Sequence, residues 1–264
     1  MIANVPGIAL NSEQEGTGPD LVLIPGLGAG VHVWYAQLKG LSPVLRVTAV
    51  DPRGHGLSEK PPGPYSLPLF ASDIAALMNH LELGPAVVVG SSMAALIAVE
   101  LAATHPERVT ALALVGGFPV LGSAGKERME ARARTADSEG LGPLADVVAS
   151  TALSAHTHQT QPALVGLFRQ GLLANDPRAY AASCRALVEA DITPRLGRIQ
   201  CPTLILLGSQ EQVAPLSAAR ALKAGIPQAR LEVIPNAGHL PFLEQPAAFN
   251  AAILEFVGGL PLSG

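Results

Sequence analysis

The sequence is poor in charge, in cysteine and in long apolar runs. Only 14% of its 264 residues are charged and the formal net charge is −4, so neither nucleic acid nor a membrane surface is an expected partner. Two cysteines, Cys184 and Cys201, cannot form a disulfide framework, and no cysteine–histidine spacing indicates a zinc site. No apolar run approaches the ~20 residues that span a bilayer, and Met1–Leu10 lacks the pattern of a signal peptide. We therefore expect a cytoplasmic protein.

Short apolar segments alternate with longer segments of helical pattern. Apolar runs bounded by glycine or proline are typical of buried parallel strands. Strands are predicted at Leu21–Ile24, Val47–Val50, Ala86–Val89, Ala111–Val115, Thr203–Leu207 and Leu231–Ile234. Helices are predicted at Val33–Leu41, Leu67–Leu83, Met93–Thr104, Ser217–Ala224 and Ala247–Val257. This alternation predicts an α/β fold with a doubly wound, mostly parallel sheet and helices on both faces.

The alternation stops between about Phe118 and Ile199, where the chain is rich in alanine, arginine and glutamine and has helical spacing. We interpret residues 118–195 as a helical lid inserted into a core of residues 1–117 and 196–264. Such an insertion would lie over the carboxyl ends of the strands, where open α/β sheets bind ligands. The alternative is a set of ordinary crossover helices, but this needs improbably long loops.

The segment Val87–Ala95 has the pattern of a strand, a tight turn and a helix. A serine on such a turn is held in a strained conformation that exposes its hydroxyl above the sheet. The residues two before and two after it must be small, which Gly90 satisfies fully and Ala94, where glycine is usual, less freely. The register predicts Ser92 as a nucleophile and Ser91 as a turn residue.

A serine hydroxyl needs a base, and the base needs an orienting acid. His239 is the candidate base, since it follows the last predicted strand and a turn-forming glycine. Glu211 is the only carboxylate in the loop after the strand Thr203–Leu207, so it is the candidate acid in the chain order serine, acid, histidine. The alternative is that Glu211 is a solvated loop residue. His156 lies in the insertion, where it could contact a substrate.

A glycine-rich loop, Gly26-Leu27-Gly28-Ala29-Gly30, follows the first predicted strand. The N–H groups of Leu27 and Met93 are the expected pair of donors for an oxyanion. The glycine spacing of this loop does not match a dinucleotide-binding or phosphate-binding loop, so we expect no bound nucleotide. Gly26 is expected to border the substrate, and Trp34 to line the pocket just past this loop. The turn Asp51–Ser58 is assigned a structural role in bracing the loop.

These five motifs together resemble the α/β-hydrolase superfamily over essentially the whole chain. The end of the insertion, from Asn175 to Ile192, looks like the lid of 3-oxoadipate enol-lactonases and related small esterases. The resemblance implies Ser92, Glu211 and His239 as a triad and Leu27 with Met93 as the oxyanion donors. Pro25, Ala94 and Glu211 depart from the commoner histidine, glycine and aspartate.

The leading hypothesis is hydrolysis of a small-molecule ester, lactone or thioester through an acyl-enzyme, without metal or cofactor. Carbon–carbon bond hydrolysis or cofactor-free perhydrolysis on the same triad, and a non-catalytic ligand-binding protein, are the alternatives. An enol-lactone substrate would need a site for its carboxylate, and the insertion offers Arg128, Arg132, Arg134, Arg169 and Arg178. A monomer and a homodimer both remain open.

Overall fold

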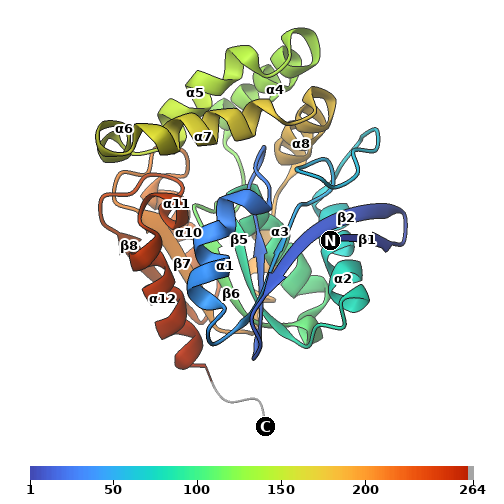
Figure 1. The fold of residues 1–264 in the computed structure, drawn as a ribbon, viewed down its shortest axis with the longest axis vertical. Coiled ribbons are helices and arrows are strands. Elements are labelled where there is room, and N and C mark those ends of the chain that lie inside the picture. Colours follow the sequence, from blue (N-terminus) through green and yellow to red (C-terminus); the bar gives the residue numbers. More distant parts are fainter. Residues whose placement is uncertain (261–264) are drawn as a thin grey trace.

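The computed structural model of the protein describes residues 1–260, which form one eight-stranded sheet between layers of helices (Figure 1). The strands are β1 (Ile2–Val5), β2 (Ile8–Glu15), β3 (Asp20–Ile24), β4 (Arg46–Val50), β5 (Ala86–Ser91), β6 (Val109–Val115), β7 (Thr203–Gly208) and β8 (Ala229–Ile234). Their order is β1-β2-β4-β3-β5-β6-β7-β8. The strands β3 to β8 pair in parallel, whereas β1 and β2 are antiparallel. The predicted fold class, a mostly parallel α/β sheet, is confirmed.

Both faces of the sheet are apolar because its central strands are buried on both sides. In β3, Val22 and Ile24 face one core cluster, and Leu21 and Leu23 face the other. The first cluster contains α2 (Leu67–His80), α3 (Met93–Thr104) and α10 (Leu216–Gly225). The second contains α1 (Tyr35–Leu41) and α12 (Pro246–Gly258). Because successive side chains point to opposite faces of the sheet, one strand packs against helices on both faces.

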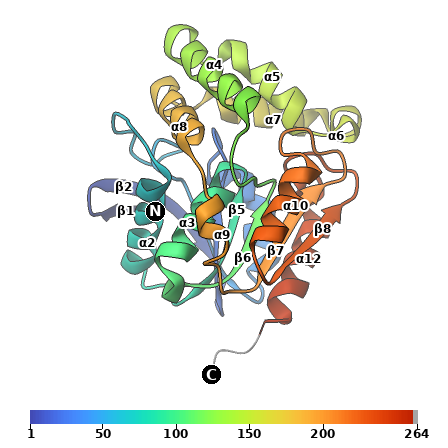
Figure 2. The same ribbon diagram turned by 180° about the vertical axis from the view of Figure 1, so that it is seen from behind.

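The segment between β6 and β7 forms a separate group of helices at one end of the sheet. They are α4 (Ser123–Glu139), α5 (Gly142–Ala152), α6 (Ala155–Thr160), α7 (Pro162–Leu173) and α8 (Pro177–Glu189), and we call them the helical layer. Figures 1 and 2 show it at the top of the molecule from opposite sides, with α9 (Thr193–Leu196) below it. Residues 116–202, all of which the structure describes, contain no strand.

Local sequence explains where these helices begin. Pro143, Pro162 and Pro177 each lie in the first turn, where proline's fixed φ suits a helix and its missing N–H is not needed. Asp176 caps α8 by accepting a hydrogen bond from the Ala179 N–H at 2.8 Å. The layer has its own small core, in which Tyr180 and Cys184 are buried.

Within residues 1–260, no helix is both long enough and apolar enough to cross a membrane.

Candidate active site

Ser92 lies on a sharp turn between β5 and α3, with φ of 55° and ψ of −116°. A non-glycine residue at positive φ is strained, and such strain persists only where the surroundings enforce it. Here the Ser92 N–H donates to the Val115 carbonyl at 2.8 Å, which ties the turn to β6. A Cβ on Gly90 would come within 2.1 Å of the Ala94 carbonyl oxygen, so the turn can close only over glycine at position 90.

Ala94 departs from the usual glycine, and the structure shows how it fits. Its side chain is fully buried in the apolar cluster around α3. The group that presses on Gly90 is the Ala94 carbonyl, which every residue type has. A methyl group at position 94 is therefore accommodated by the core without displacing the turn.

His239 and Glu211 form a buried pair at the carboxyl ends of β7 and β8. The His239 Nδ1 to Glu211 Oε2 distance is 2.7 Å, and the two side chains are 5% and 3% exposed. The other carboxylate oxygen, Oε1, accepts N–H groups from Val213 at 2.6 Å and Ala214 at 3.0 Å. These contacts use both oxygens of Glu211, so it is not a solvated loop residue.

The pKa of the Glu211 carboxyl reflects these contacts. Burial raises it, but the hydrogen bond and charge of His239 and the two backbone N–H groups lower it more, so the net pKa lies below the ordinary value. Glu211 is therefore a carboxylate at neutral pH. Among the described residues nothing bonds to His239 Nε2, so this nitrogen remains available to a substrate or to Ser92.

Gly116 is a site residue whose role sequence reasoning missed. It follows β6 with φ of 57°, and a Cβ there would lie 2.7 Å from His239 Cε1 and 2.8 Å from Nδ1. The same Cβ would come within 3.3 Å of Glu211 Oε2. The bare backbone at position 116 therefore makes room for the histidine–glutamate pair. The sequence feature that could have indicated this role is the glycine pair directly after the predicted strand Ala111–Val115.

The loop after β3 brings Leu27 next to the serine turn. A Cβ on Gly26 would lie 3.0 Å from the Ser92 Cβ, which shows how closely the two backbones approach. Within the described chain, neither the Leu27 N–H nor the Met93 N–H donates to a protein acceptor. Two unpaired N–H groups beside a serine hydroxyl match what an oxyanion site requires.

Two polar side chains hold this loop in place. Asp51 accepts the Val31 N–H at 2.6 Å and the Leu57 N–H at 2.8 Å, so the turn after β4 does brace the glycine-rich loop. Asn175, between α7 and α8, donates its side-chain amide to the Gly28 carbonyl at 2.7 Å. The loop is thus fastened both to the sheet and to the helical layer.

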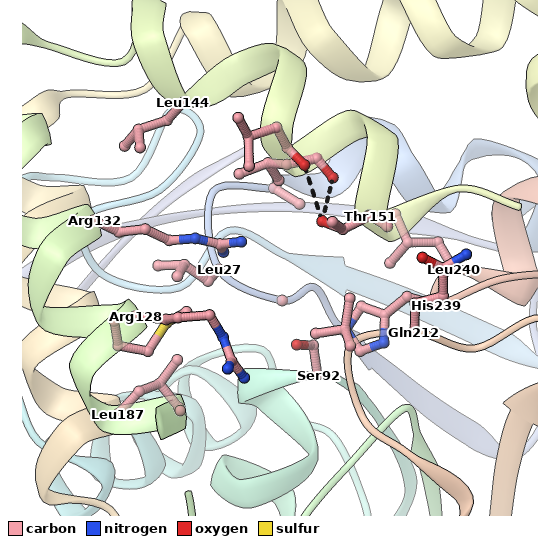
Figure 3. Close-up of a pocket in the computed structure, with 18 of the residues that line it drawn as sticks. Leu27, Ser92, Arg128, Arg132, Leu144, Thr151, Leu187, Gln212, His239 and Leu240 are labelled. Carbon is pink, nitrogen blue, oxygen red and sulfur yellow. Dashed lines mark hydrogen bonds between the residues drawn. The ribbon is translucent and has the colours of Figure 1, made fainter. Parts of the chain in front are cut away.

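Ser92 and His239 open into a cavity of about 500 Å³ between the sheet and the helical layer. Its walls are mainly apolar and include Leu27, Phe118, Leu144, Val148, Phe168, Leu187 and Leu240. Figure 3 shows Ser92 and His239 together on one side, with Arg128 and Arg132 reaching in from α4 on the other. One cavity therefore brings together six of the predicted site residues: Gly26, Leu27, Ser92, His239, Arg128 and Arg132.

Other predicted substrate contacts are corrected by the structure. Trp34 is fully buried and stacks on Phe242 with ring centroids 3.9 Å apart, so it lies behind the cavity wall that Phe242 forms. His156 is not in the lining, because α6 turns the adjacent Thr157 toward the core and His156 away from it.

Three of the five arginines predicted as carboxylate contacts also lie outside the cavity. Arg134 faces Glu130 on the outside of α4, and Arg169 pairs with Asp146 on the surface. Arg178 is exposed at the start of α8.

Arg128 and Arg132 carry charge that the protein does not neutralise. They lie one helical turn apart on α4, and neither pairs with a carboxylate in the described part of the chain. Beside Arg132, burial raises the pKa of the Tyr180 hydroxyl far above its ordinary value and that of the Cys184 thiol to about 12. Both groups are therefore neutral at physiological pH, and two guanidinium groups face a cavity whose walls are mainly apolar.

The residues described contain no cluster of three or more histidine, cysteine, aspartate or glutamate side chains placed to hold a metal ion.

The sequence pattern of the alpha/beta hydrolase fold matches residues 19–246. The chain belongs to the α/β-hydrolase family. As an α/β-hydrolase it is 32% identical over 248 residues to 3-oxoadipate enol-lactonase 2 of Acinetobacter baylyi, covering 93% of this chain and 92% of that protein. It is 34% identical to a pimeloyl-[acyl-carrier protein] methyl ester esterase of Chromobacterium violaceum, covering 92% and 96% of the two chains. The crystal structure of the enol-lactonase from Burkholderia xenovorans LB400 superposes with a TM-score of 0.93 at 32% identity, covering 98% of this α/β-hydrolase and 100% of that chain.

Proposed function

We propose that the protein hydrolyses carboxylic esters or lactones through an acyl-enzyme on Ser92. The observation that carries the proposal is that Ser92, in its strained turn, lines the same cavity as His239. The Nδ1 atom of this histidine contacts the buried carboxylate of Glu211. The names of the relatives support ester hydrolysis. A serine, a base and an orienting acid on the strand ends are the parts that acyl transfer requires.

The chemistry follows from the positions of these groups. Ser92 Oγ attacks the carbonyl carbon while His239 Nε2 accepts its proton, and Glu211 keeps the proton on Nδ1. The N–H groups of Leu27 and Met93 stabilise the negative charge that develops on the carbonyl oxygen. His239 then returns the proton to the leaving alcohol, and a water molecule activated in the same way releases the acid.

The helical layer acts as a lid in this proposal, and it selects the substrate. Arg128 and Arg132, which have no carboxylate partner among the described residues, project into a cavity whose other walls are mainly apolar. Arg132 is half-buried and Arg128 is exposed. A guanidinium that lines a cavity of this kind binds a carboxylate well, through two parallel hydrogen bonds. The preferred substrate is therefore an ester or lactone with a short apolar chain that ends in a carboxylate.

The two arginines give a prediction about selectivity. Arg128→Ala and Arg132→Ala should each raise KM for a carboxylate-bearing ester about tenfold, because the charge-assisted contact of that arginine with the carboxylate is lost. KM for a neutral ester of the same length should stay nearly the same. Arg134→Ala, on the outside of α4, is the matched control and should leave both values unchanged. Equal losses for the charged and the neutral ester would remove the arginines from substrate recognition.

The ionisation of Glu211 gives a prediction about pH. Because hydrogen bonds depress the pKa of Glu211, this carboxylate stays charged to pH values below the ordinary glutamate range. The acid side of a plot of log kcat/KM against pH should therefore contain no step from Glu211 above about pH 4.3, the ordinary pKa of a glutamate. A slope near 2 above that pH would contradict the role of Glu211.

Partitioning of the acyl-enzyme tests the reaction type. Two esters with the same acyl group and different alcohols should give the same ratio of methyl ester to free acid when methanol is added, since both pass through one intermediate. Different ratios would argue against the acyl-enzyme. Cleavage of a vinylogous diketone faster than of any ester or lactone would assign the site to carbon–carbon bond hydrolysis instead.

A further inference from the structure

A buried carboxylate lies between the helical layer and the loop that carries His239. It belongs to Glu244, the last residue of α11 (Pro241–Glu244), which is 2% exposed. In the part of the chain that the structure describes, no lysine, arginine or histidine forms an ion pair with it. Burying a charge in this way is unfavourable unless N–H or O–H donors satisfy it. An apolar residue here would avoid that cost.

Three donors satisfy Glu244, and they come from two different parts of the molecule. Oε1 accepts the Gly238 N–H at 2.7 Å, one residue before His239. Oε2 accepts the Ser154 N–H and the Thr157 hydroxyl, both at 2.7 Å, at the start of α6 in the helical layer. One carboxylate therefore links the loop of the base to the layer that covers the cavity.

The same two segments also touch directly. The His239 N–H donates to the Ala152 carbonyl at 2.9 Å. A Cβ on Gly238 would lie 2.8 Å from the Ser154 nitrogen and 3.0 Å from the Ala152 oxygen, so glycine is needed for this approach. Two successive N–H groups of the histidine loop are thus held by partners outside the loop.

The contact with Glu211 fixes the rotation of the imidazole ring, but the backbone at 238 and 239 sets its distance from Ser92. We infer that Glu244 is a positioning residue that aligns His239 with Ser92 and makes this alignment depend on the helical layer being seated on the core. The inference rests on the proposed role of His239 as base. A substrate that holds the layer in place would in this way also hold the base in place.

Glu244→Gln is the discriminating substitution because it keeps the size of the side chain. In the wild type, Oε1 accepts a hydrogen bond from the histidine loop and Oε2 accepts hydrogen bonds from the helical layer. The amide of glutamine has one oxygen, so it can accept on one side only, and its NH₂ group then faces the donors on the other side. We expect kcat for a p-nitrophenyl ester to fall on the order of 10²-fold per titrated active site, the effect of displacing a catalytic group by about 1 Å. KM should change less than about twofold, because no group that contacts the substrate is altered.

Thr157→Val extends the test to a residue of the layer that does not line the cavity. It removes one donor to Glu244 while the Thr157 N–H still caps α6 through the Ser154 hydroxyl. We expect kcat to fall about three- to tenfold with KM unchanged. Thr160→Val is the matched control, since its hydroxyl bonds only to the His156 carbonyl on the exposed side of the same helix. This variant should have the kcat of the wild type.

An unchanged kcat per titrated site in Glu244→Gln overturns the inference, even if its melting temperature falls, because the residue is then only structural. If the glutamine variant does not fold, an unchanged kcat in Thr157→Val overturns it. Ser92→Ala in the same assay separates the two proposals. An active Ser92→Ala contradicts the proposed function, whereas an inactive Ser92→Ala beside a fully active Glu244→Gln contradicts the positioning role alone.

Discussion

Ser92→Ala is expected to lower the turnover of a p-nitrophenyl ester on the order of 10⁶-fold, the loss typical when the serine of such a triad is removed. The reason is that no other hydroxyl occupies the strained turn between β5 and α3. The variant should fold normally, because alanine at position 92 leaves the Ser92 N–H bond to Val115 in place. The residual rate should come from the oxyanion donors and binding alone.

Ser91→Ala is the matched control for this substitution. Ser91 ends β5, is fully buried, and its hydroxyl has no partner among the residues described. Its replacement should leave kcat within about twofold of the wild type, since alanine fits the same space and no hydrogen bond of the Ser91 hydroxyl is lost. A reversed result, with Ser91→Ala inactive and Ser92→Ala active, would show that the nucleophile is assigned to the wrong serine.

Glu211→Gln should lower kcat by about 10⁴-fold, because the amide would enforce the wrong tautomer of the base. Val213 and Ala214 donate N–H groups to Oε1, so the amide oxygen must stay on that side. The NH₂ group then faces His239 Nδ1 and donates to it. The remaining imidazole proton moves to Nε2, which can no longer accept a proton from Ser92.

Glu211→Gln should leave the fold unaffected, because only the position of the proton on the His239 imidazole changes. The measurement is kcat per titrated active site, with thermal unfolding of each variant. Glu255→Gln, an exposed position on α12, is a control for the loss of one negative charge. Activity of Glu211→Gln close to that of the wild type would mean that another group orients His239.

Local sequence patterns correctly predict most strands of the sheet. All six predicted strands are present as β3 to β8. Those from β3 to β7 are buried parallel strands with mainly apolar sequences, whereas β8 lies at an edge of the sheet and only its Ile234 is buried. The hairpin of β1 and β2 was missed, since β2 ends in the polar residues Asn11–Glu15 and the pair lies at an edge of the sheet. An edge hairpin lacks the apolar signal that marks a central strand.

The site residues that sequence reasoning found belong to local motifs. Ser92 was identified from its strand, turn and helix, and Glu211 and His239 from loops that follow strands. The roles of Gly116, Asn175 and Glu244 were missed because they depend on contacts between segments far apart in the chain. No pattern within one segment reports such a contact.

The errors on Trp34 and His156 have the same origin. Their place in the chain brings them near the cavity, but neighbouring residues take the positions in its wall or turn their side chains away. Arg128 and Arg132 were predicted together with three other arginines, and only the packed orientation of α4, α7 and α8 separates the two that face the cavity. Helix rotation of this kind follows from packing of the whole layer.

Covalent labelling with a p-nitrophenyl alkylphosphonate tests the central claim most directly, because this reagent transfers its phosphonyl group to an activated serine. We predict one equivalent of p-nitrophenolate per protein, full loss of esterase activity, and a single phosphonyl group on the peptide that contains Ser92. Ser92→Ala should take up none. A phosphonyl group on a different residue, or full activity after stoichiometric labelling of Ser92, would contradict the account.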